Sequence, residues 1–198
     1  MQHVYQLLAL RAMHKQVEQK PPRLAVVLVD MNYPKEDINP VRGTLEECIA
    51  LQCRLLEAAR RLGMPRAILR EGYVVSPTFD ALVAAAGPDA ECVLKWEHTA
   101  FGSAQFVEFL DRGGINTLVL AGYELNTCLY KTAYDARRFG YAFMTAEDII
   151  LHHTMGEMAM QGKIEEGIGF YRKNGECYRT AKELMAVMER TVTEAATN

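Results

Sequence analysis

The chain has 198 residues, a formal net charge of −3, and a composition of 49% hydrophobic and 24% charged residues. These values are ordinary for a globular protein, and we expect a single domain over residues 1–198. They exclude a nucleic-acid binder, which needs a concentrated basic face, and no run approaches the ~18 apolar residues of a membrane span.

The cysteines and the N-terminus suggest a compartment. The sequence holds five cysteines, an odd number without the spacing of a disulfide framework, which favours free thiols in a reducing environment. The first residues lack the basic start of a signal peptide. We therefore expect a cytoplasmic protein.

The first part of the chain predicts a helix, a strand and a second helix. Residues 3–19 have an amphipathic helical pattern that ends before Pro21-Pro22, because the residue before a proline is pushed out of the helical region. This helix belongs to an N-terminal extension over residues 1–22. Residues 24–29 form a wholly apolar strand, and Thr44 with Glu47 makes a capping box that starts the next helix.

Strands and helices then alternate along the chain, which predicts a three-layer α/β/α fold with a mostly parallel central sheet. Asn174-Gly175 indicates either a hairpin or a turn into a last edge strand. The expected strands span residues 24–29, 66–69, 92–94, 116–121 and 141–144, and the expected helices span residues 44–62, 79–85, 103–110, 128–139 and 182–193, with a short Met-rich helix within 149–162.

Three of these strands lead to residues with reactive side chains. Asp30 and Lys95 end their strands, and Cys128 follows the strand at 116–121 at the start of a helix that Asn126 or Thr127 can cap. Such ends meet at one edge of a parallel sheet. The helix dipole and a nearby ammonium lower a thiol's pKa, and a carboxylate can act as general base.

Three segments carry a resemblance to a known family. They are AVVLVDMN at 25–32, VLKWEHTAF at 93–101 and GINTLVLAGYELNTCLYKTAYDARRFGY at 114–141. Together they resemble the isochorismatase-like cysteine hydrolases, which include nicotinamidases and N-carbamoylsarcosine amidohydrolases. The resemblance implies Asp30 as base, Lys95 as cationic partner and Cys128 as nucleophile. It also implies a cis peptide between Tyr123 and Glu124, whose second amide would bind the oxyanion together with that of Cys128.

The sequence departs from relatives in two places. Residues 66–94 contain no histidine, so the Asp-x-His metal site of nicotinamidases is absent from that segment and we expect neither metal nor organic cofactor. Glu124 stands where the family usually has a small residue, and Asn126 where an acid is common. If Glu124 points into the cleft, it repels anionic substrates or holds a cationic group; if it points away, it has no such effect.

Several neighbours of the three reactive positions are candidate pocket walls, with ordinary packing as the alternative. His98 follows Lys95 by three residues and could reach the cleft mouth, whereas His152-His153 fit a loop or helix surface better than a ligand pair. Cys92 alternates within a strand and is expected in the core. The candidate walls are Asn32, Tyr33, Trp96, Phe101 and Tyr123.

We therefore expect a hydrolase that cleaves an amide or ureide C–N bond of a small molecule through a thioester on Cys128. One alternative is a vinyl-ether hydrolase of the isochorismatase type that uses Asp30 alone. Another is a catalytically silent homologue that binds a small molecule. The resemblance implies a homo-oligomer, a dimer or tetramer, and the helix at 3–19 gives a local reason for a subunit contact.

Overall fold

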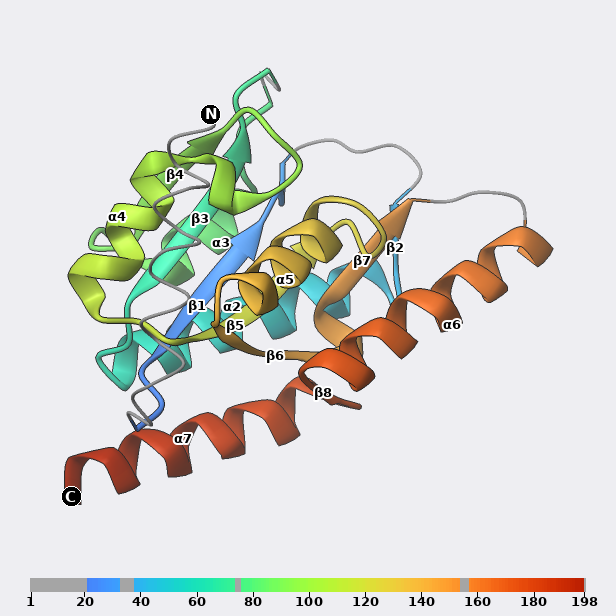
Figure 1. Cartoon of the computed structure of the whole chain (residues 1–198). Helices are drawn as coiled ribbons and strands as arrows, with labels where there is room; N and C mark the ends of the chain where they lie inside the picture. The colour runs from blue at the N-terminus through green and yellow to red at the C-terminus, as the bar shows by residue number, and fades with distance from the viewer. Residues whose placement is uncertain (1–20, 33–37, 74–75, 154–156, 198) are drawn as a thin grey trace.

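The computed structural model describes residues 21–32, 38–73, 76–153 and 157–197 (Figure 1). The helix expected over 3–19 and the candidate wall residue Tyr33 lie outside these ranges. None of the described helices is long and apolar enough to cross a membrane.

An eight-stranded sheet forms the middle layer. Its main path runs in the order β2-β7-β5-β1-β3-β4, with β6 paired to β5 and β8 paired to β6. Every pair of these strands is parallel except β2 with β7. The strands are β1 (Leu24–Val29), β2 (Ile38–Pro40), β3 (Arg66–Glu71), β4 (Glu91–Lys95), β5 (Thr117–Tyr123), β6 (Ala142–Ala146), β7 (Ile150–His153) and β8 (Glu176–Tyr178).

Helices cover both faces of the sheet (Figure 1). Helices α4, α5 and α6 pack on one face, and α2, α3 and α7 on the other. Because successive side chains of a strand point to opposite faces, Val27 of β1 lies in the first core and Val26 in the second. The helices are α2 (Leu45–Arg61), α3 (Asp80–Ala86), α4 (Ala104–Gly113), α5 (Cys128–Arg138), α6 (Glu157–Asn174) and α7 (Ala181–Thr197). The expected α/β/α fold is confirmed.

Local sequence signals set several helix boundaries. Thr44 and Glu47 form both hydrogen bonds of the capping box, and α2 ends just before Gly63, as predicted. The apolar face expected for α5 is fully buried. Thr127 is the residue before α5, but its side chain makes no capping bond. Its hydroxyl instead donates a hydrogen bond to the carboxylate of Glu124.

The C-terminal third contains two strands that the sequence pattern did not clearly predict. Residues 150–153 form β7 rather than part of a loop or helix, so His152 is buried and His153 exposed on opposite sides of a strand. The turn at Gly175 leads from α6 into β8, which pairs in parallel with β6. A parallel partner rules out the hairpin, because a hairpin joins antiparallel strands.

Strand β4 ends the main path of the sheet, which changes one expectation about its side chains. Cys92 is exposed rather than buried in the core, and Leu94 on the same side of the strand is also half exposed. An edge strand is less completely covered than a central one, so the alternation of β4 places one of its sides toward solvent. Lys95, at its end, points inward.

Candidate active site

Asp30 comes directly after β1 and is held in an unusual backbone conformation. Its φ of 50° lies in the left-handed region, which costs a residue with a side chain about 1–3 kcal/mol. Its N–H donates to the carbonyl of Leu69 on β3, and its carbonyl accepts from the N–H of Asn32, both at 3.0 Å. These bonds hold the fully buried carboxylate at the edge where the parallel strands end.

Lys95 and Asp30 form a buried ion pair across this edge. The Lys95 Nζ lies 2.7 Å from Asp30 Oδ2, and neither side chain is exposed. Burial lowers the pKa of Lys95, but the negative charges of Asp30 and Cys128 outweigh it and leave the pKa raised. Burial also raises the pKa of Asp30, and Lys95 only partly offsets this. Lys95 therefore stays charged beside a carboxylate that accepts protons more readily than usual.

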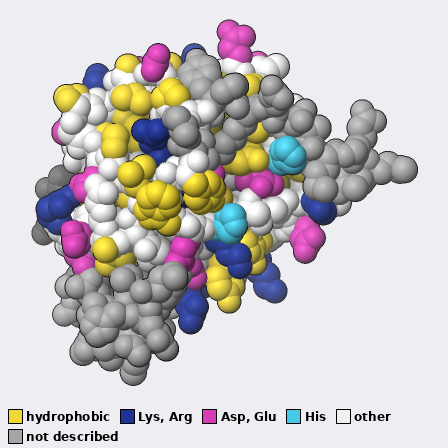
Figure 2. Space-filling view, turned by 90° about the horizontal axis from the view of Figure 1, so that it is seen from above, with side chains coloured by type: hydrophobic (Ala, Val, Ile, Leu, Met, Phe, Trp, Pro, Cys, Tyr) yellow, Lys and Arg dark blue, Asp and Glu magenta, His cyan; other side chains and the backbone are white. Residues whose placement is uncertain are grey.

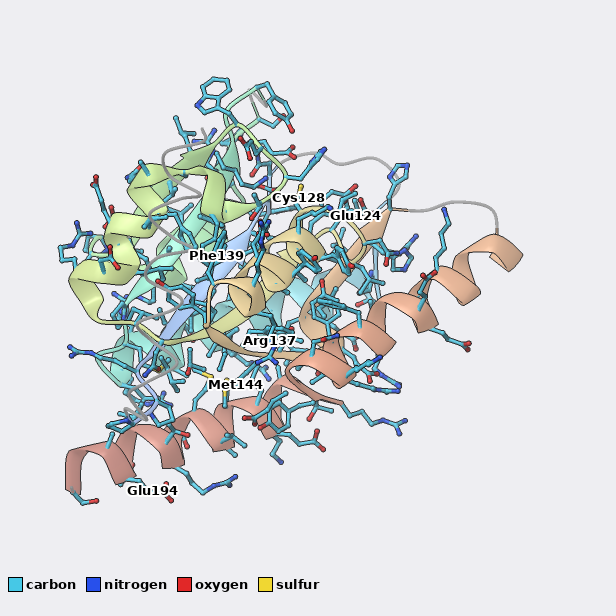
Figure 3. The ribbon with its side chains drawn as sticks, in the orientation of Figure 1. Glu124, Cys128, Arg137, Phe139, Met144 and Glu194 are labelled. Carbon is cyan, nitrogen blue, oxygen red and sulfur yellow. The ribbon has the colours of Figure 1, made fainter. Side chains whose placement is uncertain are left out.

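Cys128 is the first residue of α5 and lies at the same edge (Figure 3). Its Sγ is 3.3 Å from Oε1 of Glu71 and 3.6 Å from Nδ1 of His98. The side chain is almost fully buried, whereas His98 is exposed. The structure thus brings together the three residues that the sequence singled out, together with Glu71 and His98.

The surroundings of Cys128 do not favour its thiolate. Burial raises the pKa of Cys128, the charges of Asp30 and Glu71 raise it further, and Lys95 lowers it only in part. The expectation of a pKa lowered by the helix dipole and the ammonium is therefore wrong. The physical reason is that two carboxylates and loss of water act against one ammonium. The raised pKa favours the thiol over the thiolate, so a base is needed to take its proton.

Glu71 is the residue of the site that sequence reasoning missed. It is the last residue of β3, with Oε1 3.7 Å from Lys95 Nζ and within hydrogen-bond distance, 3.1 Å, of the Tyr73 hydroxyl that donates to it. The strand was expected to end at Leu69, two residues too early. A longer strand would have identified Glu71 by the same rule that identified Asp30 and Lys95, a charged residue at a strand end.

The turn between β5 and α5 is shaped by a close backbone approach. Gly122 has a φ of 115°, and a Cβ there would lie 2.2 Å from the carbonyl oxygen of Val29, so only glycine fits. The peptide bond between the two residues that follow, Tyr123 and Glu124, is cis, at the position that the resemblance indicated. The carbonyl of Glu124 accepts from the N–H groups of Thr127 and Leu129, which fixes the loop that leads to Cys128.

Glu124 is half-buried and engaged within its own loop. Its carboxylate accepts the hydrogen bond from Thr127, the residue before Cys128. Its charge also raises the pKa of Tyr171 on α6, although burial is the larger cause there. Figure 3 shows Glu124 beside Cys128 at the same end of the sheet. The carboxylate is therefore held at the start of α5 by the residue that precedes Cys128.

The residues predicted to line the pocket differ in how far they are buried. Asn32 is buried two residues from Asp30, and its side-chain amide has no hydrogen-bond partner among the residues that the structure describes. Trp96 is 69% exposed and lies over Gly72. Phe101 is fully buried and packs edge-on against Phe106. Phe101 is thus a core residue, and the expectation that it lines the pocket is wrong.

A groove opens beside Cys128. It has a volume of about 440 Å³ and contains both His98 and Tyr73, which also belong to the cluster around Glu71. Figure 2 looks onto this edge and shows histidine, acidic and hydrophobic side chains gathered there. The groove combines aromatic rings with charges of both signs. Its lining residues are Tyr73, Trp96, Glu97, His98, Thr99, Lys131, Tyr134, Asp135 and Arg138.

Comparison with models of protein families shows which family the chain belongs to. The Isochorismatase domain matches residues 25–160, more than half of the sequence. The chain belongs to the isochorismatase family. As a member of this family it is a hydrolase, and the matched residues include Asp30, Lys95 and Cys128. Among proteins with curated functions, none has a significantly similar sequence.

Solved structures share the isochorismatase fold at low sequence identity. A putative isochorismatase from Burkholderia xenovorans has a TM-score of 0.75 and 18% identity, covering 87% of this chain and 90% of its own. A cysteine hydrolase from Pseudomonas syringae has a TM-score of 0.70 and 17% identity, with coverages of 89% and 95%. A nicotinamidase from Staphylococcus aureus has a TM-score of 0.66 and 13% identity, with coverages of 80% and 98%.

Proposed function

We propose that this isochorismatase-family chain hydrolyses an amide or ureide C–N bond of a small molecule through a thioester on Cys128. The observation that carries the proposal is the convergence of a thiol, a proton-accepting carboxylate and a buried ammonium at one sheet edge. The Lys95–Asp30 distance of 2.7 Å and the raised pKa of Asp30 support it. The printed functions of two structural neighbours, a cysteine hydrolase and a nicotinamidase, add an argument by analogy.

In the first half of the reaction Asp30 takes the proton of the Cys128 thiol while Sγ attacks the substrate carbonyl. The Asp30 carboxylate forms side-chain hydrogen bonds with both Lys95 and Cys128, and its pKa is raised by burial, so it can take this proton directly from the thiol. A C–S bond forms, and the carbonyl electron pair moves to the oxygen. The backbone N–H groups of Glu124 and Cys128 stabilise that oxyanion. As the C–N bond breaks, Asp30 returns the proton to the departing nitrogen.

In the second half a water molecule gives a proton to Asp30 and attacks the thioester. The tetrahedral adduct then expels the sulfur, which recovers the proton from Asp30, and the product acid leaves. The carboxylate acts as base and then as acid in each half. Lys95 compensates the negative charge that passes between Cys128 and Asp30, which explains why a charged ammonium is buried there.

Two alternatives make different predictions. A vinyl-ether hydrolase that uses Asp30 alone would keep its turnover in Cys128→Ala and lose it in Asp30→Asn. A silent homologue that binds a small molecule would turn over nothing in either form. The single experiment is a panel of small primary amides and ureides assayed with wild type, Cys128→Ala and Asp30→Asn, with intact-mass detection of an acyl adduct.

Turnover lost in both variants, with an adduct of the acyl mass on wild-type Cys128, is the expected result. Turnover retained in Cys128→Ala would remove the thiol from the mechanism. Cys92→Ser is the matched control because Cys92 is an exposed cysteine on β4, and it should leave the rate unchanged.

We also propose a cytoplasmic homo-oligomer. All five cysteines are free, which fits a reducing compartment. Sizing by light scattering of the full chain tests the second half of the proposal, and a monomer at micromolar concentration would contradict it.

A further inference from the structure

A second chemistry is available to the cluster around Cys128. One carboxylate oxygen of Glu71, a ring nitrogen of His98 and the sulfur of Cys128 all lie within 4.8 Å of one another. Glutamate, histidine and cysteine are three of the side chains that bind Zn²⁺. We propose that Glu71, His98 and Cys128 form a three-ligand site for Zn²⁺ that reversibly blocks Cys128.

The distances fit tetrahedral coordination. With Zn–S of about 2.3 Å and Zn–O or Zn–N of about 2.0–2.1 Å, ligand atoms at the corners of a tetrahedron stand about 3.3–3.6 Å apart. The Sγ of Cys128 is 3.3 Å from Oε1 of Glu71 and 3.6 Å from Nδ1 of His98. Two of the three ligand pairs therefore already have tetrahedral spacing, and the third pair, Glu71 with His98, lies within 4.8 Å, a gap that a side-chain rotation of the exposed His98 can close.

The charges around the sulfur also favour a dication. Asp30 and Glu71 are two carboxylates, and Lys95 supplies one positive charge, so a thiolate here adds to an excess of negative charge. A bound Zn²⁺ compensates the thiolate and the excess together, and the thiol proton leaves to solvent on binding. The Lys95 ammonium lies 2.7 Å from Asp30 Oδ2 and 3.7 Å from Glu71 Oε1, so Asp30 is its closer partner and compensates its charge.

The surroundings give the site a supporting partner, an entry path and an open position. Tyr73 donates its hydroxyl hydrogen to Glu71 Oε1 at 3.1 Å, an outer contact of the kind that orients metal ligands. His98 and Tyr73 both face the groove of about 440 Å³, through which an ion can reach His98, whose Nδ1 is 3.6 Å from the Cys128 sulfur. Three protein ligands leave the fourth position for water, as in open zinc sites.

A zinc ion bound at this site would prevent Cys128 from acting as a nucleophile. A metal-bound thiolate has its electron pair in the Zn–S bond, so it cannot attack a carbonyl or an alkylating reagent. The binding itself rests on the geometry alone, whereas inhibition of turnover rests on the proposed hydrolase function. Removal of the ion by a chelator restores the free thiol, which makes the block reversible.

The test uses the full-length protein freed of metal and titrated with Zn²⁺ against a chromophoric chelator. Co²⁺ as a probe reports sulfur ligation through its thiolate-to-metal charge-transfer absorption. The ligand variants are His98→Ala, Cys128→Ser and Glu71→Gln. The matched controls are His153→Ala, Cys92→Ser and Glu108→Gln, each an exposed residue of the same type outside the cluster.

We expect Zn²⁺ to bind wild type and the controls equally, and each ligand variant at least about 10-fold more weakly, since loss of a mere supporting partner already costs 10–100-fold. Co²⁺ should show the charge-transfer band in wild type and not in Cys128→Ser. Binding of unchanged affinity in His98→Ala would overturn the proposal, and so would a Co²⁺ spectrum that does not depend on Cys128. His98 is exposed, so its variant folds normally.

A second readout separates this inference from the proposed function. Zn²⁺ should protect Cys128 from iodoacetamide, as measured by peptide mass, whether or not a substrate is known. Protection together with no turnover of any amide would support the metal site and contradict the hydrolase. Turnover that depends on Cys128, with no protection and no inhibition by Zn²⁺, would support the hydrolase and overturn the metal site.

Discussion

Lys95 Nζ lies 2.7 Å from Asp30 Oδ2 with both side chains fully buried, although β3 separates the strands that carry them. The pair therefore spans the end of β3, where Glu71 also contacts Lys95. Two charges taken out of water remain stable only while they face each other. This relationship ties the stability of the sheet edge to the chemistry proposed for it.

The first prediction follows from that pair. Lys95→Met leaves the Asp30 carboxylate buried without its cation, so the free energy of unfolding at pH 7 should fall by about 3–5 kcal/mol. Urea unfolding followed by circular dichroism measures it. Lys182→Met, at an exposed position of α7, should change stability by less than about 0.5 kcal/mol. Asp30→Asn in addition to Lys95→Met should recover part of the loss, and a double variant less stable than Lys95→Met would contradict the argument.

The second prediction concerns the pH dependence of Cys128. Because its pKa is raised, the thiol persists to high pH, and alkylation of Cys128 should accelerate only in the alkaline range. Glu71→Gln removes one of the negative charges that raise this pKa, so the rise in rate should move to lower pH. Iodoacetamide kinetics resolved by peptide mass test this in metal-free protein, with Glu108→Gln as control. A shift to higher pH would show that Glu71 does not act through its charge.

The raised pKa of Cys128 also limits its reactivity with alkylating reagents at neutral pH. Slow alkylation of Cys128 at neutral pH does not indicate a silent protein, because burial and two carboxylates hold the sulfur as a thiol until a substrate arrives. An enzyme is therefore distinguished from a silent homologue by detection of the acyl adduct and by the turnover of Cys128→Ala, and not by the rate of alkylation.

The third prediction addresses the turn before Cys128. Gly122→Ala places a Cβ 2.2 Å from the carbonyl oxygen of Val29 and forces a side chain into a φ of 115°. The free energy of unfolding should fall by about 3 kcal/mol or more. Gly169→Ala is the control, because Gly169 lies in α6 with open space around it, and alanine there should stabilise by about 0.5–1 kcal/mol. Thermal and urea unfolding measure both, and equal stabilities of the two variants would contradict the prediction.

The fourth prediction concerns acid stability. Glu147 is buried directly after β6 and forms ion pairs with Arg42 and Arg172. Burial raises the pKa of Glu147, but its hydrogen bonds to both arginines outweigh this and lower it below the ordinary value of 4.5. The folded state therefore gains stability from Glu147 above pH 4.5 and loses it as the pH falls through the lowered pKa.

Glu147→Gln should accordingly cost about 1–2 kcal/mol at pH 7, at the low end for charged hydrogen bonds because both arginines are exposed. The cost should shrink toward zero as the pH drops through that pKa. Urea unfolding at a series of pH values checks it, with Glu194→Gln on the exposed end of α7 as control. A cost that stays constant with pH would mean that the arginines do not stabilise the ionised carboxylate.

Features that depend on near neighbours in the chain could be predicted from the amino-acid sequence. The apolar run of β1 ending at Asp30, the capping box at Thr44 and the apolar face of α5 are local patterns. Alternation of such elements specified the α/β/α layers, because a parallel sheet needs a crossover between successive strands. The positions of these residues at or after the ends of their strands then predicted that Asp30, Lys95 and Cys128 lie at the same edge of the sheet.

The surroundings of those three residues could not be predicted in this way, because they depend on contacts between distant segments of the chain. The order of the strands places β3 between β1 and β4, so Glu71 enters the site, and the loop after β4 brings His98 to the sulfur. Phe101 likewise packs in the core, because Phe106 of α4 and Phe139, directly after α5, pack against it. The pKa of Cys128 depends on how much water is excluded and which charges remain nearby, and both are set by packing between segments far apart in the sequence. The sequence located the thiol, and the fold determined that it rests protonated among two carboxylates, an ammonium and an imidazole.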